Sequence, residues 1–211
     1  RGVLECILWK PEFQWLVQRI KVLRPISFTS FKRNEITTKP KSCIDITEID
    51  GNGKPHYRTQ RNGIVLQDVE YIIEAAIFMT EDNIKKVKMQ DIAMFNRRVS
   101  KGQCWHQPYL GTREFSCEFF PVTEEDENRV SELNLTYPIG GMLFDVLYNA
   151  NREATPVYMY DAVIRNGILE CPEERNRQML STTHLRAKKS EFINQVLFDF
   201  NKKEEEQCSQ N

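Results

Sequence analysis

Apolar and polar side chains alternate along three stretches of the chain, which is the pattern expected of β-strands. Residues 13–28 begin with an alternating aromatic and β-branched run, and they predict one long strand or two strands bent near Pro25. Residues 64–79 alternate as a half-buried strand should, and residues 115–122 alternate again. We therefore expect the first part of the chain to form a sheet.

Two stretches have helical features instead. Residues 1–8 are typical of the last turns of a helix that ends at Pro11, because proline pushes the residue before it out of the helical region. A second helix is expected from about Asn83, an N-cap residue, to Gly102, a residue type that commonly ends helices in the left-handed conformation. The chain opens within an apolar pattern and without Met, so we also expect a missing segment upstream.

Residues 32–63 differ from the rest of the chain, because Lys, Arg, Thr, Asn, Gly and Pro dominate them. The sequence Asp50-Gly51-Asn52-Gly53 predicts a tight turn. We expect a long polar loop between strands, and loops of this length are usually functional or disordered.

Together these elements predict an α+β protein in three parts. The first, residues 1–122, is a ferredoxin-like (RRM-like) βαββαβ domain that lacks its first strand and most of its first helix. The second, residues 123–172, is a small antiparallel β-sheet domain with a hairpin turn at Asn166-Gly167. The third, residues 173–211, is a polar and partly helical tail.

Composition places the chain in the soluble globular class, with 40% hydrophobic and 28% charged residues. No apolar run approaches the roughly 18 to 20 residues that cross a bilayer, and no signal peptide is visible, so we expect a cytoplasmic protein without membrane contact. The six cysteines lack any CxxC spacing, which indicates reduced thiols: Cys6, Cys43, Cys104, Cys117, Cys171 and Cys208.

Charge is divided unevenly along the chain. The net charge is only -1, yet residues 1–113 hold 19 Lys/Arg against 12 Asp/Glu, whereas residues 114–211 hold 10 against 18. This division suggests a basic surface in the first half that neutralises phosphates, although chance clustering of solvated charges would give the same counts.

The densest group of basic and aromatic residues lies between positions 96 and 113. Cations that grip phosphates beside rings that stack on unpaired bases are typical of RNA binding. The alternative is structural, because cations in the last turn of a helix stabilise its dipole and the aromatic rings can belong to the core. The group contains Arg97, Arg98, Lys101, Trp105, His106, Tyr109 and Arg113.

A second basic group borders the polar stretch, with Lys32 and Arg33 at its beginning and Arg58 and Arg61 at its end. Because a loop between strands favours contact with a partner over packing, we expect these cations to bind RNA in a salt-dependent manner.

Metal and nucleotide sites are not predicted. His56, His106 and His184 are isolated, Cys104 and His106 lack two further ligands, and no P-loop or nucleophile motif is present, so we expect no metal or cofactor. Cleavage of RNA without a metal requires a general base for the 2′-hydroxyl and an acid for the leaving oxygen. The residues chemically eligible for these roles are His106, Tyr109, Lys88 and Lys101.

Several ordered motifs between residues 2 and 172 resemble the subtype I-C CRISPR-associated "Cas-five d" family of the RAMP superfamily. They are Gly2-Val3-Leu4-Glu5, Leu8-Trp9-Lys10-Pro11, Val22-Leu23-Arg24-Pro25-Ile26, Arg33-Asn34-Glu35, Lys101-Gly102-Gln103-Cys104, Pro108-Tyr109-Leu110-Gly111-Thr112-Arg113-Glu114-Phe115 and Gly141-Met142-Leu143-Phe144-Asp145. The resemblance implies a ferredoxin-like domain with a small C-terminal sheet. It also implies that the protein recognises the hairpin repeat of precursor CRISPR RNA, cuts at the hairpin base without metal, and keeps the 5′ handle among the other subunits of the interference complex.

The resemblance also locates the family's catalytic positions in this chain. Family members use an aromatic or histidine residue just before the Trp-Lys-Pro motif, where this chain has Leu8 ahead of Trp9 and Lys10. Their Lys-His pair falls near Gln90 and Asp91. Leucine cannot move a proton and Gln-Asp is not equivalent to Lys-His, although a shift of one turn would bring Lys88 into play.

The leading hypothesis is a metal-independent endoribonuclease that also serves as a scaffold. It is expected to grip RNA through Trp9, Lys10, Lys32, Arg33, Arg58, Arg61, Arg97, Arg98, Lys101, His106, Tyr109 and Arg113. The second hypothesis is a non-catalytic subunit that holds the handle, and the third is an RRM-like module outside CRISPR defence.

Overall fold

The computed structural model describes residues 1–37, 47, 49–53, 57–80, 89–148, 153–171 and 187–199. The chain divides into two compact units. The main unit comprises Arg1–Pro25 and Val69–Asn211, and the second unit, Ile26–Asp68, is a two-stranded ribbon. The domain boundaries expected at 122 and 172 stay a prediction.

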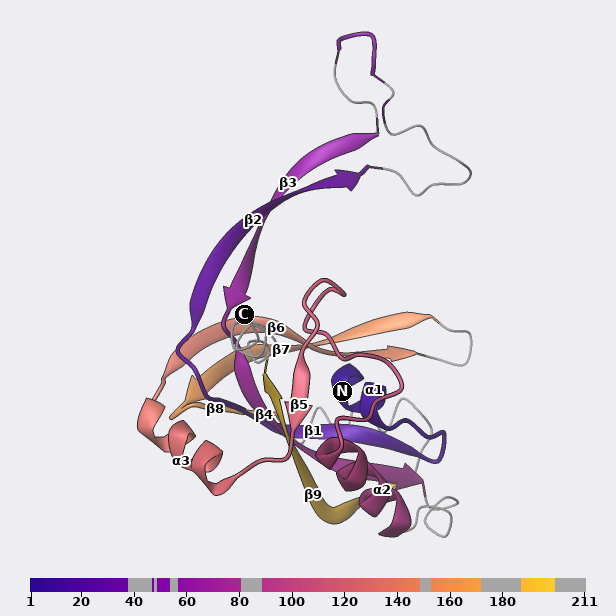
Figure 1. Cartoon of the computed structure of the whole chain (residues 1–211), viewed down its shortest axis with the longest axis vertical. Helices are drawn as coiled ribbons and strands as arrows, with labels where there is room; N and C mark the ends of the chain where they lie inside the picture. The colour runs from indigo at the N-terminus through magenta and orange to yellow at the C-terminus, as the bar shows by residue number, and fades with distance from the viewer. Residues whose placement is uncertain are drawn as a thin grey trace, which may run out of the picture. The chain divides into compact units, whose positions relative to one another are not determined.

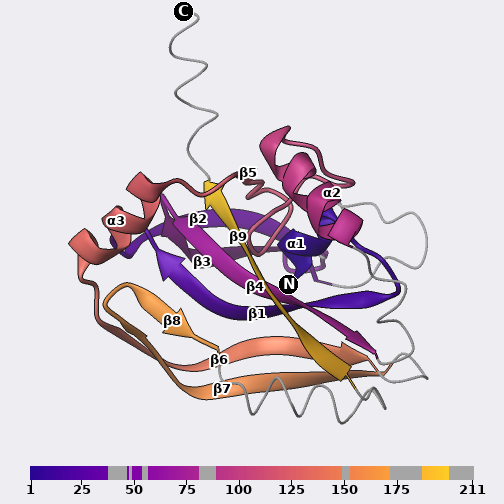
Figure 2. The same cartoon turned by 90° about the horizontal axis from the view of Figure 1, so that it is seen from below.

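The main unit is built on a seven-stranded sheet in the order β5-β9-β4-β1-β8-β7-β6, in which all neighbours pair antiparallel (Figure 1). Its strands are β1 (Phe13–Val22), β4 (Glu70–Thr80), β5 (Glu118–Phe120), β6 (Tyr137–Tyr148), β7 (Ala154–Arg165), β8 (Ile168–Glu170) and β9 (Ala187–Asp199). Its helices are α1 (Gly2–Ile7), α2 (Met89–Ser100) and α3 (Glu124–Leu133). Figure 2 shows β1 and β4 side by side, with α1 and α2 at one end and α3 at the other.

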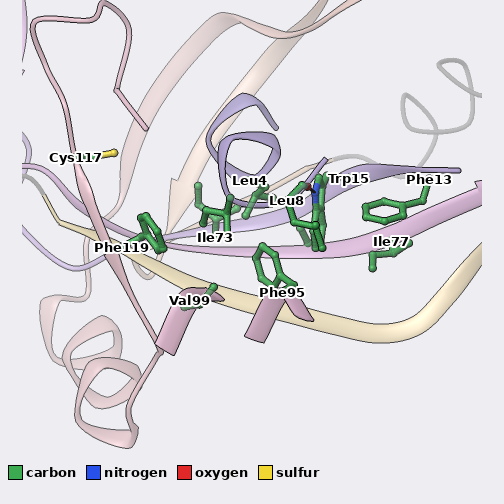
Figure 3. Packing of buried hydrophobic residues seen from close by; sticks show 12 residues of the cluster. Leu4, Leu8, Phe13, Trp15, Ile73, Ile77, Phe95, Val99, Cys117 and Phe119 are labelled. Carbon is green, nitrogen blue, oxygen red and sulfur yellow. Dashed lines mark hydrogen bonds between the residues drawn. The ribbon is translucent and has the colours of Figure 1, made fainter. Parts of the chain in front are cut away.

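The main hydrophobic core forms where α1 and α2 cover one face of β1 and β4 (Figure 3). Trp15 of β1 is its largest buried side chain, with its ring centroid 4.6 Å from that of Phe95 on α2. The indole Nε1 donates a hydrogen bond of 2.8 Å to the carbonyl oxygen of Leu8, which satisfies the polar atom of this buried ring. The core therefore fixes the chain just after α1.

Strand β4 is buried on both faces. Ile73 and Ala75 face α1 and α2, whereas Ile72 packs on the other face against Leu23 and Val130 of α3. The expectation of a half-buried strand is wrong because a central strand with helices on both sides has no solvent face. One strand over 64–79 is also wrong, since the chain turns at Asp68, where φ is 52°.

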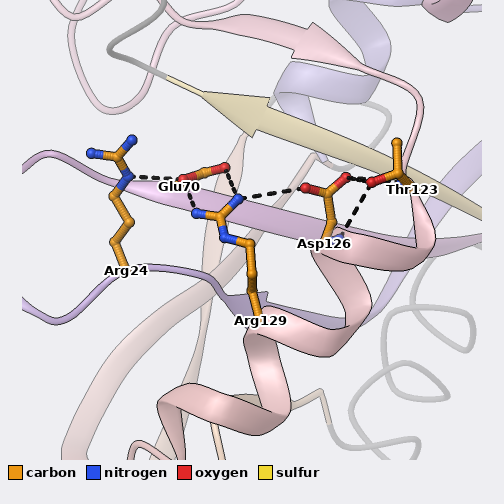
Figure 4. Close-up of polar contacts among 5 residues, drawn as sticks. All are labelled: Arg24, Glu70, Thr123, Asp126 and Arg129. Atoms are coloured by element: carbon orange, nitrogen blue, oxygen red, sulfur yellow. Dashed lines mark hydrogen bonds and ion pairs between the residues drawn. The ribbon is translucent and has the colours of Figure 1, made fainter.

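Ion pairs attach α3 to the sheet beneath it (Figure 4). The Glu70 carboxylate accepts hydrogen bonds of 2.8 and 2.7 Å from the two terminal nitrogens of Arg129, and one of 2.8 Å from Nε of Arg24. Thr123 and Asp126 form a capping box at the first turn of α3, which satisfies backbone N–H groups there. The position of α3 is thus fixed by polar as well as apolar contacts.

Several sequence expectations are confirmed. The first helix ends before Pro11, the 13–28 segment is two strands, and Asn166-Gly167 is the turn between β7 and β8. The helix predicted from Asn83 is seen from Met89 onward, and residues 81–88 lie outside the described residues.

The fold class is confirmed as mixed α and β with antiparallel sheets, but the βαββαβ order is not. Strand β9 lies between β4 and β5, and it comes from the tail that was expected to be partly helical. The helical expectation for residues 187–199 is wrong, because free edges of β4 and β5 supply backbone partners that local spacing does not reveal.

The second unit replaces most of the expected polar loop with regular structure. Strands β2 (Ser27–Ile36) and β3 (Arg58–Gln67) pair antiparallel over their full length. The loop expectation is wrong for these strands because both faces of the ribbon are largely exposed, so no alternation of apolar residues marks them. The turn at Asp50 is confirmed by the 3.0 Å hydrogen bond from Gly53 N–H to the Asp50 carbonyl.

Candidate nucleic-acid interface

The basic residues at the end of α2 are positioned by a helix-terminating motif. Gln103 N–H donates to Arg98 O at 2.8 Å and Gly102 N–H to Val99 O at 3.2 Å, with Gly102 in the left-handed conformation at φ 61°. This is the Schellman arrangement, and the terminating role predicted for Gly102 is confirmed. Arg97 and Lys101 are four residues apart and both exposed, so they lie on one solvent-facing side of the helix end.

Arg98 has a structural partner that the sequence did not reveal. Its Nη1 donates a 2.6 Å hydrogen bond to the carbonyl oxygen of Ile7, the last residue of α1. The carbonyls at a helix end lack partners within the helix, so a guanidinium there satisfies one of them and favours the dipole. The geometry shows that Arg98 joins α2 to α1, and its contact with RNA stays a prediction.

The loop after α2 is held against the same end of α1. Trp105 N–H donates to the Cys6 carbonyl at 2.8 Å, and His106 N–H to the same oxygen at 3.5 Å. The Trp105 side chain nevertheless points to solvent with 80% of its surface exposed, and Trp9 is 63% exposed. The core alternative for Trp105 is therefore wrong, and the backbone of α1 and this loop presents two indole rings to solvent.

The exposed rings suit stacking on bases. His106 is exposed, and its ring lies edge-on to that of Trp105 with centroids 5.8 Å apart. Aromatic side chains that are held by their backbone but open to solvent provide platforms for unpaired bases. Trp9, Trp105 and His106, together with Arg97 and Lys101, are called the α1–α2 surface below.

Tyr109 and Arg113 lie on a small hairpin that follows. Leu110 N–H donates to Phe115 O at 2.9 Å, a bridge joins Tyr109 and Ser116, and Gly111 takes a φ of 85° that glycine favours. Tyr109 is 39% exposed and Arg113 is exposed, so both are open to a partner. The alternative that Tyr109 belongs to the hydrophobic core is therefore wrong.

The positions where the resemblance places the family's catalytic residues carry different chemistry in this chain. Leu8 is 2% exposed and apolar, and Gln90 is exposed. The carboxylate of Asp91 is buried and accepts a hydrogen bond from Nζ of Lys10. Lys10 was expected to bind RNA, and its cation already has this carboxylate as a partner. Lys88, the other candidate, lies outside the described residues.

The cations of the ribbon fall on opposite faces. Lys32 and Arg58 are exposed on one face, whereas Arg33 and Arg61 lie opposite each other on the other face, where both pair with Glu35 at 2.7 and 3.2 Å. The Arg33 guanidinium also lies 5.6 Å from the centre of the Phe31 ring. Within this group, Lys32 and Arg58 are therefore the cations whose charge is not shared with the Glu35 carboxylate.

The thiols and the carboxylates do not form a reactive or metal-binding group where the structure describes them. Cys6, Cys104, Cys117 and Cys171 are free, as expected of reduced thiols, while Cys43 and Cys208 lie outside the described residues. Burial raises the pKa of Cys117 and of Cys171 to about 12, which keeps both thiols protonated and unreactive. Among the described residues, no three His, Cys, Asp or Glu side chains gather as metal ligands, and every helix is too short or too polar to cross a bilayer.

These features define a class of protein, an α+β chain with antiparallel sheets, an exposed aromatic and basic surface beside two helices, and a basic β-ribbon. The chain belongs to the Cas5d family, because the model of the family described as "CRISPR-associated protein (Cas_Cas5)" matches residues 1–195. The resemblance seen in the sequence motifs is thereby confirmed.

Two relatives are named "CRISPR pre-crRNA endoribonuclease Cas5d". The one from Mannheimia succiniciproducens is 35% identical over 188 residues, which cover 82% of this chain and 80% of the relative. The one from Thermus thermophilus is 34% identical over 203 residues, which cover 85% of this chain and 80% of the relative.

Two solved structures share the fold. A crystal structure titled as a CRISPR-associated protein has a TM-score of 0.56 at 22% identity, covering 81% of this chain and 76% of that one. A functionally uncharacterized protein from Streptococcus mutans has a TM-score of 0.54 at 19% identity, covering 92% of this chain and 81% of that one.

Proposed function

We propose that this chain binds the repeat hairpin of precursor CRISPR RNA, processes it as an endoribonuclease, and keeps the 5′ handle within a subtype I-C interference complex. The observation that carries the proposal is the α1–α2 surface, where exposed Trp9 and Trp105 lie with the cations Arg97 and Lys101. Rings that can stack and cations that can contact phosphates, exposed near the ends of α1 and α2, suit a folded RNA with unpaired bases. The names of the two relatives support this reading.

Cleavage is proposed to be metal-independent, with the 2′-hydroxyl of the RNA as the nucleophile. This reaction needs a base, an acid and cations near the phosphate, but no bound ion. On the α1–α2 surface, His106 carries the exposed imidazole, the side-chain type that most often transfers protons in catalysis, and Lys101 is a cation for the phosphate. His106 is therefore our candidate proton-transfer residue.

Incubation of the protein with its repeat RNA in EDTA tests this proposal. We expect a single site-specific cut in the wild type, and a rate reduced by roughly 100-fold or more in His106→Asn, since general acid–base catalysis contributes about that much. RNA binding by gel shift should remain within a few-fold in this variant. Loss of cutting in EDTA with recovery in Mg²⁺ would contradict the metal-independent mechanism, and unchanged cutting by His106→Asn would remove His106 from it.

A second candidate function is a handle-binding scaffold that does not cut. It is favoured by the burial of apolar Leu8 and by the pairing of Asp91 with Lys10, because neither family position then offers a free proton-transfer group. Intact RNA that stays bound in the same EDTA assay would establish this candidate and exclude the first.

We also propose that the main unit corresponds to a ferredoxin-like core and that the ribbon contacts RNA or another subunit. One ribbon face carries exposed apolar side chains where Phe28 and Leu66 are paired and Ile64 lies next to them. A two-stranded ribbon is marginally stable alone, and exposed apolar residues on it support a role in contact with a partner.

A further inference from the structure

A pocket on the β7–β8 hairpin lies outside the α1–α2 surface and outside the ribbon. It has a volume of about 500 Å³, within the range of small-ligand sites, and its polar lining includes Tyr160, Asp161, Arg165 and Asn166. Met159, Ala162 and Ile168 supply apolar walls. No part of the function proposed above uses these residues.

The shape of the pocket is set by an irregularity in β7. Gly140 pairs with Ala162 and Met142 pairs with Met159, so the single residue Gly141 faces two residues, Tyr160 and Asp161. This is a β-bulge, and bulges redirect side chains. Both Tyr160 and Asp161 are exposed between buried Met159 and Ala162, whereas strict alternation would turn one of them inward.

The other side of the pocket is equally fixed. Asn166 and Gly167 have φ values of 50° and 77°, which make the tight turn from β7 to β8. Gly167 N–H donates to Leu135 O at 2.7 Å, and Val22 N–H donates to Gly167 O at 2.8 Å. A turn held from two directions keeps Asn166 in place without a ligand, so little ordering is needed on binding.

The side chains around the pocket match one unpaired nucleobase. Tyr160 is 68% exposed and Tyr158 44%, with ring centroids 6.4 Å apart, so this strand presents two neighbouring aromatic side chains largely to solvent. Among the described residues, no ion pair involves Asp161 or Arg165, whereas Glu170, the other carboxylate that lines the pocket, lies 4.0 Å from Nε of Arg19. A carboxylate only accepts hydrogen bonds, so its partner must be a donor such as a base amino group.

We propose that this pocket takes a single unpaired base of the bound RNA, with Tyr160 stacking on the ring, Asp161 accepting from an amino group of the base, and Arg165 contacting the adjacent phosphate. Adenine, cytosine and guanine carry such an amino group and uracil does not. Uracil offers a carboxylate only its ring N3–H, which lies between two carbonyl oxygens that repel the carboxylate, so the site favours the three bases that carry an amino group. The proposal rests on the RNA-binding function proposed above and adds a position where one base is read.

The test measures binding of the full chain to its repeat RNA and to the single-stranded pentanucleotides A5, C5, G5 and U5 by fluorescence anisotropy. We expect Tyr160→Ala to weaken binding of the preferred pentanucleotide about tenfold, and Tyr160→Phe, which keeps the ring, to bind like the wild type. Asp161→Asn should bring the affinity for U5 close to that for the preferred pentanucleotide. Glu132→Gln, an exposed carboxylate on α3, is the matched control and should change neither quantity.

The outcomes separate this inference from the function on which it rests. Failure of the wild type to bind repeat RNA would overturn the proposed function. Normal binding of repeat RNA, with pentanucleotide affinities and base preference unchanged in both Tyr160→Ala and Asp161→Asn, would overturn the pocket alone. If Tyr160→Ala does not fold by circular dichroism, the base preference of Asp161→Asn decides the question, because a surface carboxylate-to-amide change leaves the apolar walls intact.

Discussion

At the scale of residues, the neighbouring cations at the end of α2 have different roles in the fold. Arg97 and Lys101 are exposed at the end of α2, whereas Arg98 between them donates to the Ile7 carbonyl at 2.6 Å. The sequence groups these three residues together, because it shows that they are cations near a helix end but not which atoms they contact in the fold. The fold distinguishes the two cations that are exposed from the one that supports α1.

This distinction predicts opposite effects for neighbouring substitutions. Arg97→Ala with Lys101→Ala should weaken repeat-RNA binding and lower the magnitude of the slope of log K against log salt by roughly 1.4 to 1.8, because each of the two phosphate contacts contributes about 0.7 to 0.9. The free energy of unfolding should change by less than about 0.5 kcal/mol per site. Both quantities are measurable by salt-titrated gel shift and by urea unfolding.

Arg98→Ala provides the contrast. It removes a charged hydrogen bond to a helix carbonyl, so we expect about 1 to 3 kcal/mol of destabilisation in urea unfolding. If the free energy of unfolding of Arg98→Ala equals that of the wild type, as expected for an exposed arginine, the structural role given to this side chain is wrong.

At the scale of elements, α3 is joined to the sheet by a charge network that depends on pH. Burial by itself raises the pKa of Glu70, but hydrogen bonds from Arg129 and Arg24 outweigh it and lower the pKa below its ordinary value of 4.5. Glu70 therefore contributes its full stabilisation above about pH 4.5, and the contribution is lost as pH falls through the lower pKa of the folded state.

The matching substitution is Glu70→Gln. We expect it to destabilise the protein by about 1 to 3 kcal/mol at pH 7, discounted for the partial exposure of both arginines. The difference from wild type in urea unfolding should shrink as pH falls below 4.5. A difference that stays constant down to pH 3 would show that the carboxylate charge is not what holds α3.

Elements also show why some predictions from the sequence failed. The sequence pattern did not reveal strand β2, because neither of its faces is buried and residues 32–36 therefore have the composition of a polar loop. The sequence pattern did not reveal strand β9 because the residues that pair with it, in β4 and β5, lie far earlier in the chain, as in the pair of Phe120 with Leu197. Short-range periodicity carries no information about either circumstance.

At the scale of the whole molecule, the division into two units predicts that the ribbon is dispensable for folding. Leu23 N–H donates to the Glu70 carbonyl at 3.0 Å, so the chain leaves and re-enters the main unit at adjacent points. Replacing residues 26–68 with Gly-Asn-Gly should join β1 and β4 as a simple hairpin. We expect cooperative unfolding with stability within about 1 kcal/mol, since a shorter loop closes at no greater entropic cost.

RNA binding by this shortened chain tests the ribbon's proposed role. Removal of the Lys32 and Arg58 charges should weaken repeat-RNA binding and flatten its salt dependence. Full affinity with an unchanged salt slope would confine the RNA contact to the main unit.

The sequence by itself determined the local features of this protein: the stop of α1 before Pro11, the left-handed end of α2 at Gly102, the turn at Asn166-Gly167, and the motifs that mark the family. Each depends on the conformational limits or identities of a few adjacent residues. Only the tertiary structure decided which cations are exposed, which strands share a sheet, and where a bulge opens a pocket. These depend on contacts between residues far apart in the chain, and a linear pattern does not encode which distant backbone or charge will be the partner.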